Sequence, residues 1–177
     1  MKNLIIWVHG KGGSPDEAEH YKPLCPGYDI VGLDYKSTTP WEAAEEFPRL
    51  WNRLTVGYKS VSIIANSLGA YFTMFALRDK KIERLLLISP VVDMERLITD
   101  MMSFGGITDD VLREKKIIET PFGEPLSWEY LTYVRTHPID FRGNIHILYG
   151  GRDELIARDS IEKFVVEHGA SLTVMEN

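Results

Sequence analysis

Apolar runs alternate with amphipathic stretches along most of the chain. Runs that are almost entirely apolar predict strands buried on both faces of a parallel sheet. These runs occupy 3–8, 28–35, 60–66, 84–89, 144–149 and 171–175. Between them, apolar residues fall at helical spacing. Helices are expected over 15–22, 40–54, 67–79 and 160–168. Alternating strands and helices indicate a parallel sheet covered on both faces, that is, a three-layer α/β/α fold with a six-stranded, mainly parallel sheet.

Local signals mark several helix ends. Thr39, Pro40 and Glu42 form the pattern of a capping box at the start of one helix. Pro48 is expected to kink that helix, because proline removes a backbone donor. Gly169 is expected to end the last helix at its C′ position.

Residues 91–138 do not follow this alternation of strands and helices. Helical pieces are expected over 94–102, 108–118 and 127–136. We interpret the chain as a single domain, 1–177, with an insertion at about 91–138. Because binding loops gather at one edge of such sheets, a substrate-covering lid is favoured over plain helical packing for this insertion.

Composition narrows the classes of function. The chain has 177 residues, 44% of them hydrophobic and 26% charged, and a net charge of −6. An acidic chain without a basic patch argues against nucleic-acid binding. The single cysteine, Cys25, fits a reducing compartment. Without a leader pattern or an apolar run of roughly 20 residues, the sequence predicts a cytoplasmic protein with no membrane partner.

One turn carries candidate chemistry. The strand at 60–66 runs directly into a helix through Ala65-Asn66-Ser67-Leu68-Gly69, where small residues flank a central serine two positions away on either side. A sharp strand-to-helix turn of this composition lifts the serine hydroxyl above the sheet edge. The alternative is an ordinary turn in which Ser67 caps the helix.

Two further motifs follow strands. His9-Gly10 comes after the first strand and opens a glycine-containing loop, and Asp153 comes after the strand at 144–149. Because the carboxyl ends of parallel strands share one edge, both motifs should meet Ser67 there.

The serine turn resembles the nucleophile elbow of the α/β-hydrolase family, with Ala65 where the usual pattern has glycine. Nearly all of the chain outside 91–138 is similar to a compact bacterial serine esterase. The resemblance implies an α/β-hydrolase fold lacking the first two strands, with sheet order 2-1-3-4-5-6 in chain order. It also implies Ser67 as the nucleophile and Asp153 as the acid of a triad, with Asp93 in reserve.

The resemblance implies an oxyanion hole as well. Its backbone donors would be the N–H groups of Leu68, directly after the nucleophile, and Lys11. The site would be shaped by His9, Gly10, Asn66 and Gly69. His9 is expected to be structural there rather than a base.

The triad histidine is not evident. The resemblance places it after the last strand, which ends near Met175. His168 follows Asp153 in order, but the end of a helix lies at the far edge of the sheet. We therefore expect the natural protein to continue past Asn177. The alternatives are a catalytically inactive hydrolase-like protein, a histidine from another chain, and a small-ligand-binding protein that uses the glycines of 10–13.

The implied reaction is the cleavage of an ester, thioester or amide through an acyl-enzyme, as in a carboxylesterase. The expected partner is a small-molecule acyl substrate. No cofactor or metal is expected, because zinc-ligand spacing does not occur in the sequence.

Overall fold

The computed structural model describes residues 2–121 and 123–176. The chain folds as two compact units. The sheet unit consists of residues 1–92 and 139–177, and the helical unit of residues 93–138.

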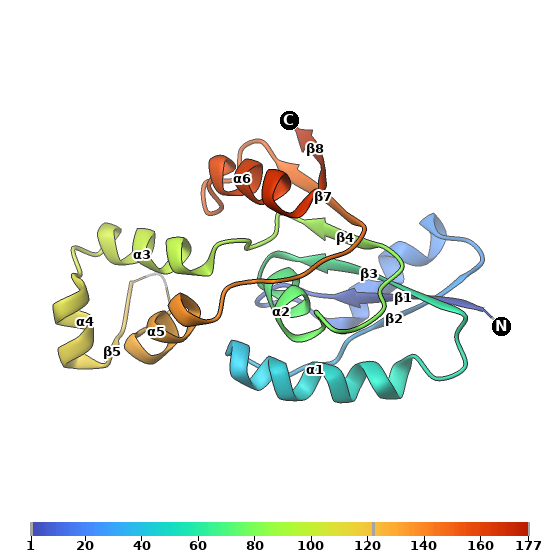
Figure 1. Cartoon of the computed structure of the whole chain (residues 1–177), viewed down its shortest axis with the longest axis horizontal. Coiled ribbons are helices and arrows are strands. Elements are labelled where there is room, and N and C mark those ends of the chain that lie inside the picture. Colours follow the sequence, from blue (N-terminus) through green and yellow to red (C-terminus); the bar gives the residue numbers. More distant parts are fainter. Residues whose placement is uncertain (1, 122, 177) are drawn as a thin grey trace. The chain divides into compact units, whose positions relative to one another are not determined.

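The sheet unit is built on six parallel strands (Figure 1). In spatial order they are β2 (Tyr28–Gly32), β1 (Asn3–Val8), β3 (Ser60–Asn66), β4 (Leu85–Ile88), β7 (Ile145–Gly150) and β8 (Ser171–Met175). In chain order this is 2-1-3-4-5-6, and every adjacent pair is parallel. The expected fold class and strand order are confirmed.

Helices cover this sheet from two sides. The 3₁₀-helix η1 (Pro15–Leu24) connects β1 to β2, in one direction across the sheet. The helices α1 (Pro40–Leu54), α2 (Ser67–Ala76) and α6 (Arg158–His168) make connections in the other direction. Because such crossovers are right-handed, η1 lies on the face opposite to these three helices, which gives the α/β/α layers.

The core follows the alternation of side chains along the strands. Ile5 and Trp7 of β1 pack with Ala18 of η1 on one face. On the other face, Val8 approaches Gly69 at the start of α2. Hydrophobic burial of both faces holds the strand ends, and the loops after them, in fixed positions.

Several helix ends agree with the sequence signals. Thr39 and Glu42 form the expected capping box, and Gly169 ends α6 in the left-handed conformation with φ of 64°. Pro48 lies inside α1, which continues as one helix to Leu54. The start of α6 was expected at 160, but the helix begins at Arg158.

The second strand was expected to reach Tyr35 but ends at Gly32. At Gly32 a Cβ atom would lie 2.0 Å from the carbonyl oxygen of Pro15, so the strand passes directly against the start of η1. Beyond it, the N–H groups of Lys36 and Ser37 donate to the carboxylate of Glu46 on α1. These bonds hold the segment as a loop.

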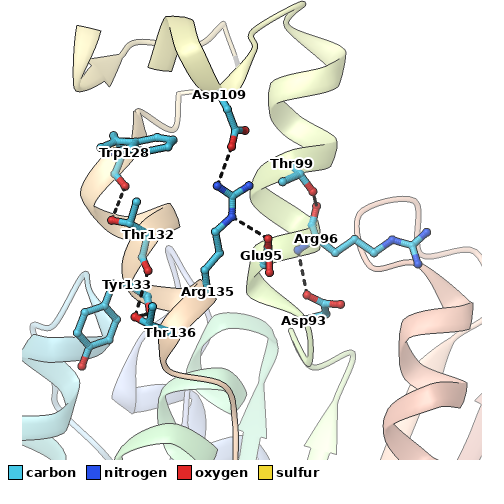
Figure 2. Close-up of polar contacts among 10 residues, drawn as sticks. All are labelled: Asp93, Glu95, Arg96, Thr99, Asp109, Trp128, Thr132, Tyr133, Arg135 and Thr136. Atoms are coloured by element: carbon cyan, nitrogen blue, oxygen red, sulfur yellow. Dashed lines mark hydrogen bonds and ion pairs between the residues drawn. The ribbon is translucent and has the colours of Figure 1, made fainter. Parts of the chain in front are cut away.

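The helical unit contains α3 (Met94–Phe104), α4 (Asp109–Lys115) and α5 (Trp128–Thr136), with a short antiparallel pair, β5 (Ile117–Ile118) and β6 (Leu126–Ser127). The expectation of a helix through residue 118 is wrong. Lys116 has φ of 65°, which ends α4 and turns the chain into β5. In Figure 2, Arg135 of α5 bonds Glu95 of α3 and Asp109 of α4, at 2.8 and 2.7 Å.

Candidate active site

Ser67 stands in a strained turn. It is the first residue of α2, directly after β3, and its φ is 48°. Residues other than glycine rarely adopt this left-handed region, which costs about 1–3 kcal/mol, and residues under such strain cluster at functional sites. The N-cap of α2 is Asn66, whose side chain instead donates to the carbonyl of Ile88, at 3.2 Å. The turn is therefore not one in which Ser67 acts as the N-cap.

Neighbouring backbone supports this turn. The N–H of Val91 donates to the carbonyl of Ser67 at 3.2 Å. A Cβ atom on Gly69 would lie 2.1 Å from the carbonyl oxygen of His9, so only glycine fits there. Ala65 is fully buried, which leaves no room for a larger side chain.

The loop after β1 touches the same turn. A Cβ atom on Gly10 would lie 2.6 Å from Asn66 Oδ1 and 3.2 Å from Ser67 Cβ. The carbonyl of Gly10 accepts from the N–H of Gly13, at 3.2 Å, and lies 2.7 Å from His9 Nδ1. The structure thus brings His9, Gly10 and the backbone leading to Lys11 beside Ser67.

The start of α2 can stabilise negative charge. Leu68 follows Ser67 in the first turn of α2. The first N–H groups of a helix lack partners within it, and the helix dipole favours an anion at this end. An oxygen bearing charge beside Ser67 would therefore face a favourable field.

Asp153 occupies a well-ordered turn after β7. Its Oδ1 accepts from the N–H groups of Leu155 and Ile156, at 3.0 and 2.9 Å. The buried Tyr149 donates its hydroxyl to the carbonyl of Ile156 at 2.6 Å and fixes the far side of this turn. Burial raises the pKa of Tyr149 above its usual range, so the phenol stays a donor.

Asp153 and Ser67 follow strands that are not neighbours. β4 lies between β3 and β7. Two strand spacings amount to about 10 Å, so an intervening side chain is needed to couple the carboxylate to the serine.

Apart from His9, the described histidines of the sheet unit lie away from Ser67 and Asp153. His146 is the second residue of β7, with Nδ1 2.7 Å from Ser171 Oγ and Nε2 3.1 Å from Thr173 Oγ1. His168, at the end of α6, donates to the carbonyl of Phe141, before β7 begins. Both lie toward the amino ends of the strands. His20 is exposed on η1.

The other residues singled out from the sequence have clear local roles. The ring of His9 stacks on Tyr35, with centroids 4.5 Å apart. Asp93 caps α3 by accepting from the N–H of Arg96 at 2.9 Å, and His137 ends α5, both in the helical unit.

Tyr35 was missed by the sequence reasoning, which placed it at the end of a strand. It is 7% exposed, and burial together with the carboxylate of Glu46 raises its pKa to about 12. Its hydroxyl donates to the carbonyl of His9 at 2.8 Å. A tyrosine in the loop that follows a strand at the ligand-binding edge was the available signal.

Residues 2–121 and 123–176 contain no cluster of three or more histidine, cysteine or acidic side chains that could hold a metal ion. None of the helices they form has the length and apolar character needed to cross a membrane.

No protein-family model matches the chain. Among curated proteins, it is similar to one from Mycoplasma genitalium named "Putative esterase/lipase 3", with 29% identity over 76 residues. This match covers 41% of the chain and 27% of that protein, so the chain aligns with about a quarter of the relative's length.

Solved structures match over nearly the whole chain. Est1E from Butyrivibrio proteoclasticus matches with a TM-score of 0.80 and 17% identity, over 98% of this chain and 78% of Est1E. The mouse alpha/beta hydrolase domain-containing protein 10 matches with a TM-score of 0.69 and 17% identity, over 97% and 78%. The chain therefore has the α/β-hydrolase fold, and the expected resemblance is confirmed at the level of the fold.

Proposed function

We propose that the chain is a serine hydrolase, a carboxylesterase in which Ser67 attacks an acyl carbonyl. The observation that carries this proposal is the φ of 48° at Ser67, in a turn packed against Gly10. Such strain has no stabilising role in the fold but presents a nucleophile at the sheet edge. Attack by Ser67 Oγ passes its proton to the base and gives a tetrahedral intermediate. Its collapse breaks the bond to the alcohol, thiol or amine, which leaves with that proton, and an acyl-enzyme remains. Water then attacks the acyl carbon, gives one proton back to Ser67 Oγ through the base, and releases the acid.

Backbone N–H groups of Leu68 and Lys11 are proposed as the oxyanion hole. The position of Leu68 in the first turn of α2 and the contact between Gly10 and Ser67 support this assignment. In characterised enzymes, one such donor lowers the barrier by about 3 kcal/mol.

Asp153 is proposed to orient a histidine that takes the proton of Ser67. No histidine described in the sheet unit lies between Ser67 and Asp153, so we propose that the base comes from outside this unit.

A small-molecule acyl compound is the proposed substrate. Est1E was solved with ferulic acid bound, so a ferulate ester belongs in a substrate panel beside simple p-nitrophenyl esters. The insertion at about 91–138 is proposed to cover the substrate. This proposal rests on the chain leaving the sheet there after β4.

Fluorophosphonate labelling of the protein tests the proposal. Ser67→Ala should abolish both labelling and ester hydrolysis, and mass spectrometry should place the adduct on Ser67. The matched control is Ser103→Ala, which removes a serine from α3 in the helical unit and should leave labelling intact.

Wild-type protein that is folded but neither labelled nor active would overturn the proposal. A thermal shift with nucleotides in that case would support the alternative of a small-ligand-binding protein that uses the loop at 10–13.

A further inference from the structure

Tyr35 contacts both the backbone and the ring of His9. Its hydroxyl donates to the His9 carbonyl at 2.8 Å, and its ring stacks on the imidazole with an interplanar angle of 17°. One buried side chain thus fixes His9 at two points.

The imidazole of His9 in turn fixes the next peptide. Nδ1 lies 2.7 Å from the carbonyl oxygen of Gly10. A carbonyl only accepts, so Nδ1 carries the hydrogen and donates. In a trans peptide the C=O and the following N–H point in opposite directions, so this bond sets the direction of the Lys11 N–H.

Tyr35 itself is held firmly. Its ring meets Phe47 of α1 and Phe72 of α2 edge-on, with centroids 5.0 and 6.2 Å away. Glu46 of α1 anchors the loop that follows Tyr35 by accepting from Ser37 N at 2.9 Å. Because its surroundings come from two helices, the ring has little freedom to shift.

We propose that Tyr35 is a positioning residue for the oxyanion hole. Acting through His9, it holds the Gly10–Lys11 peptide so that the Lys11 N–H faces the oxygen bound beside Ser67. The inference rests on the proposed function, and it assigns to Tyr35 a role in the chemical step rather than in substrate affinity.

The test compares the Tyr35→Phe and Tyr58→Phe variants of the protein. Tyr35→Phe keeps the stacked ring and removes only the hydroxyl. The control also removes a phenol hydroxyl that has a partner, Asp29 Oδ2 at 3.1 Å, near the amino end of β2. The readout is fluorophosphonate labelling of Ser67, resolved into the limiting rate constant kinact and the binding constant KI.

Tyr35→Phe should lower kinact about 10-fold, a fraction of the effect of losing an oxyanion donor, with KI within about twofold. Tyr58→Phe should change neither. Reversible partial unfolding would raise the apparent KI and leave kinact at saturating probe unchanged, so a lower kinact reports the geometry of the folded site.

Equal kinact for Tyr35→Phe and wild type would overturn the inference while leaving the proposed function standing. A rise in KI with unchanged kinact would overturn it too. Folded wild-type protein that is not labelled would overturn the proposed function, and the inference with it.

Discussion

The carbonyl oxygen of His9 lies where a side chain on Gly69 would begin. The distance from this oxygen to a Cβ atom at position 69 would be 2.1 Å, well inside van der Waals contact. Position 69, two residues after Ser67, is therefore a glycine because the backbone after β1 occupies the space that a side chain would need. The same carbonyl accepts from the Tyr35 hydroxyl, so the Ser67 turn and Tyr35 both pack against the backbone of His9.

Gly69→Ala should therefore be costly. The methyl group has to push the start of α2 away from the His9 carbonyl, and overpacking of this kind lowers the free energy of unfolding by about 1–3 kcal/mol. Gly150→Ala is the control, because the nearest atom to its Cβ would be Ser89 Oγ at an ordinary 3.7 Å. Urea denaturation measures both. Equal stability of the two variants would contradict the close contact.

Strain at Ser67 predicts an inverted order of stability. With φ of 48°, Ser67→Gly relieves the backbone while Ser67→Ala does not. We expect the glycine variant to be more stable than the alanine variant by about 1 kcal/mol in urea denaturation. At Ser103 in α3 the order should be the usual one, with alanine ahead of glycine. The same order at both positions would argue against strain at Ser67.

Much of the fold could be predicted from the sequence, because the spacing of apolar residues and the residues at helix ends indicate the same elements. The six apolar runs became the six strands of the sheet, and the capping box at Thr39 formed as expected. The predicted ends of strands and helices were wrong where contacts between distant parts of the chain, or a single backbone conformation, determine them. β2 stops at Gly32 because η1 crosses it, and Lys116 turns the chain into a short strand pair that no periodicity reveals.

The sequence was sufficient to predict which loops form the candidate site, but not which side chains contact each other there. Motifs after strands had to meet at one edge, and Gly10 does lie against Ser67. Tyr35 could not be assigned, because its bond to His9 joins residues 26 apart in the chain. The assignments of Ser67, Asp153 and the oxyanion donors stay predictions.

Two acids were proposed for the triad, and asparagine substitution separates them. Asp153→Asn keeps an oxygen for the N–H groups of Leu155 and Ile156, so the melting temperature should change little. The kcat for p-nitrophenyl acetate should fall about 100-fold or more, because a neutral amide does not stabilise the imidazolium.

Asp93→Asn is the matched control. Asparagine is as good an N-cap as aspartate, so α3 should keep its bond to the Arg96 N–H and kcat should stay within about twofold of wild type. If Asp93→Asn lost activity and Asp153→Asn kept it, Asp93 would be the acid.

Burial of Tyr35 predicts a loss of stability at high pH. Its pKa in the folded protein is raised to about 12 from an ordinary value of 10.0. The stabilisation is therefore fully present below pH 10 and is lost as the pH rises toward 12, where the unfolded chain holds fewer protons. Between these limits wild type should lose up to about 2 kcal/mol more than Tyr35→Phe in urea denaturation. Tyr28→Phe removes a phenol that is 41% exposed and should follow the wild-type curve. Parallel curves for wild type and Tyr35→Phe would contradict the raised pKa.

Arg135 is expected to hold the helical unit together. Its guanidinium joins Glu95 and Asp109, and its side chain is only 31% exposed, so the pairs are partly shielded from solvent (Figure 2). Arg135→Gln should lower the free energy of opening of α3 and α5 by about 1 kcal/mol, which appears as faster amide hydrogen exchange over 94–136. Arg113→Gln is the control, because Arg113 is 60% exposed and pairs with Asp110 in its own helix, an arrangement that contributes little. If both variants accelerated exchange equally, the ion pairs of Arg135 with Glu95 and Asp109 would stabilise the helical unit no more than an exposed pair within one helix.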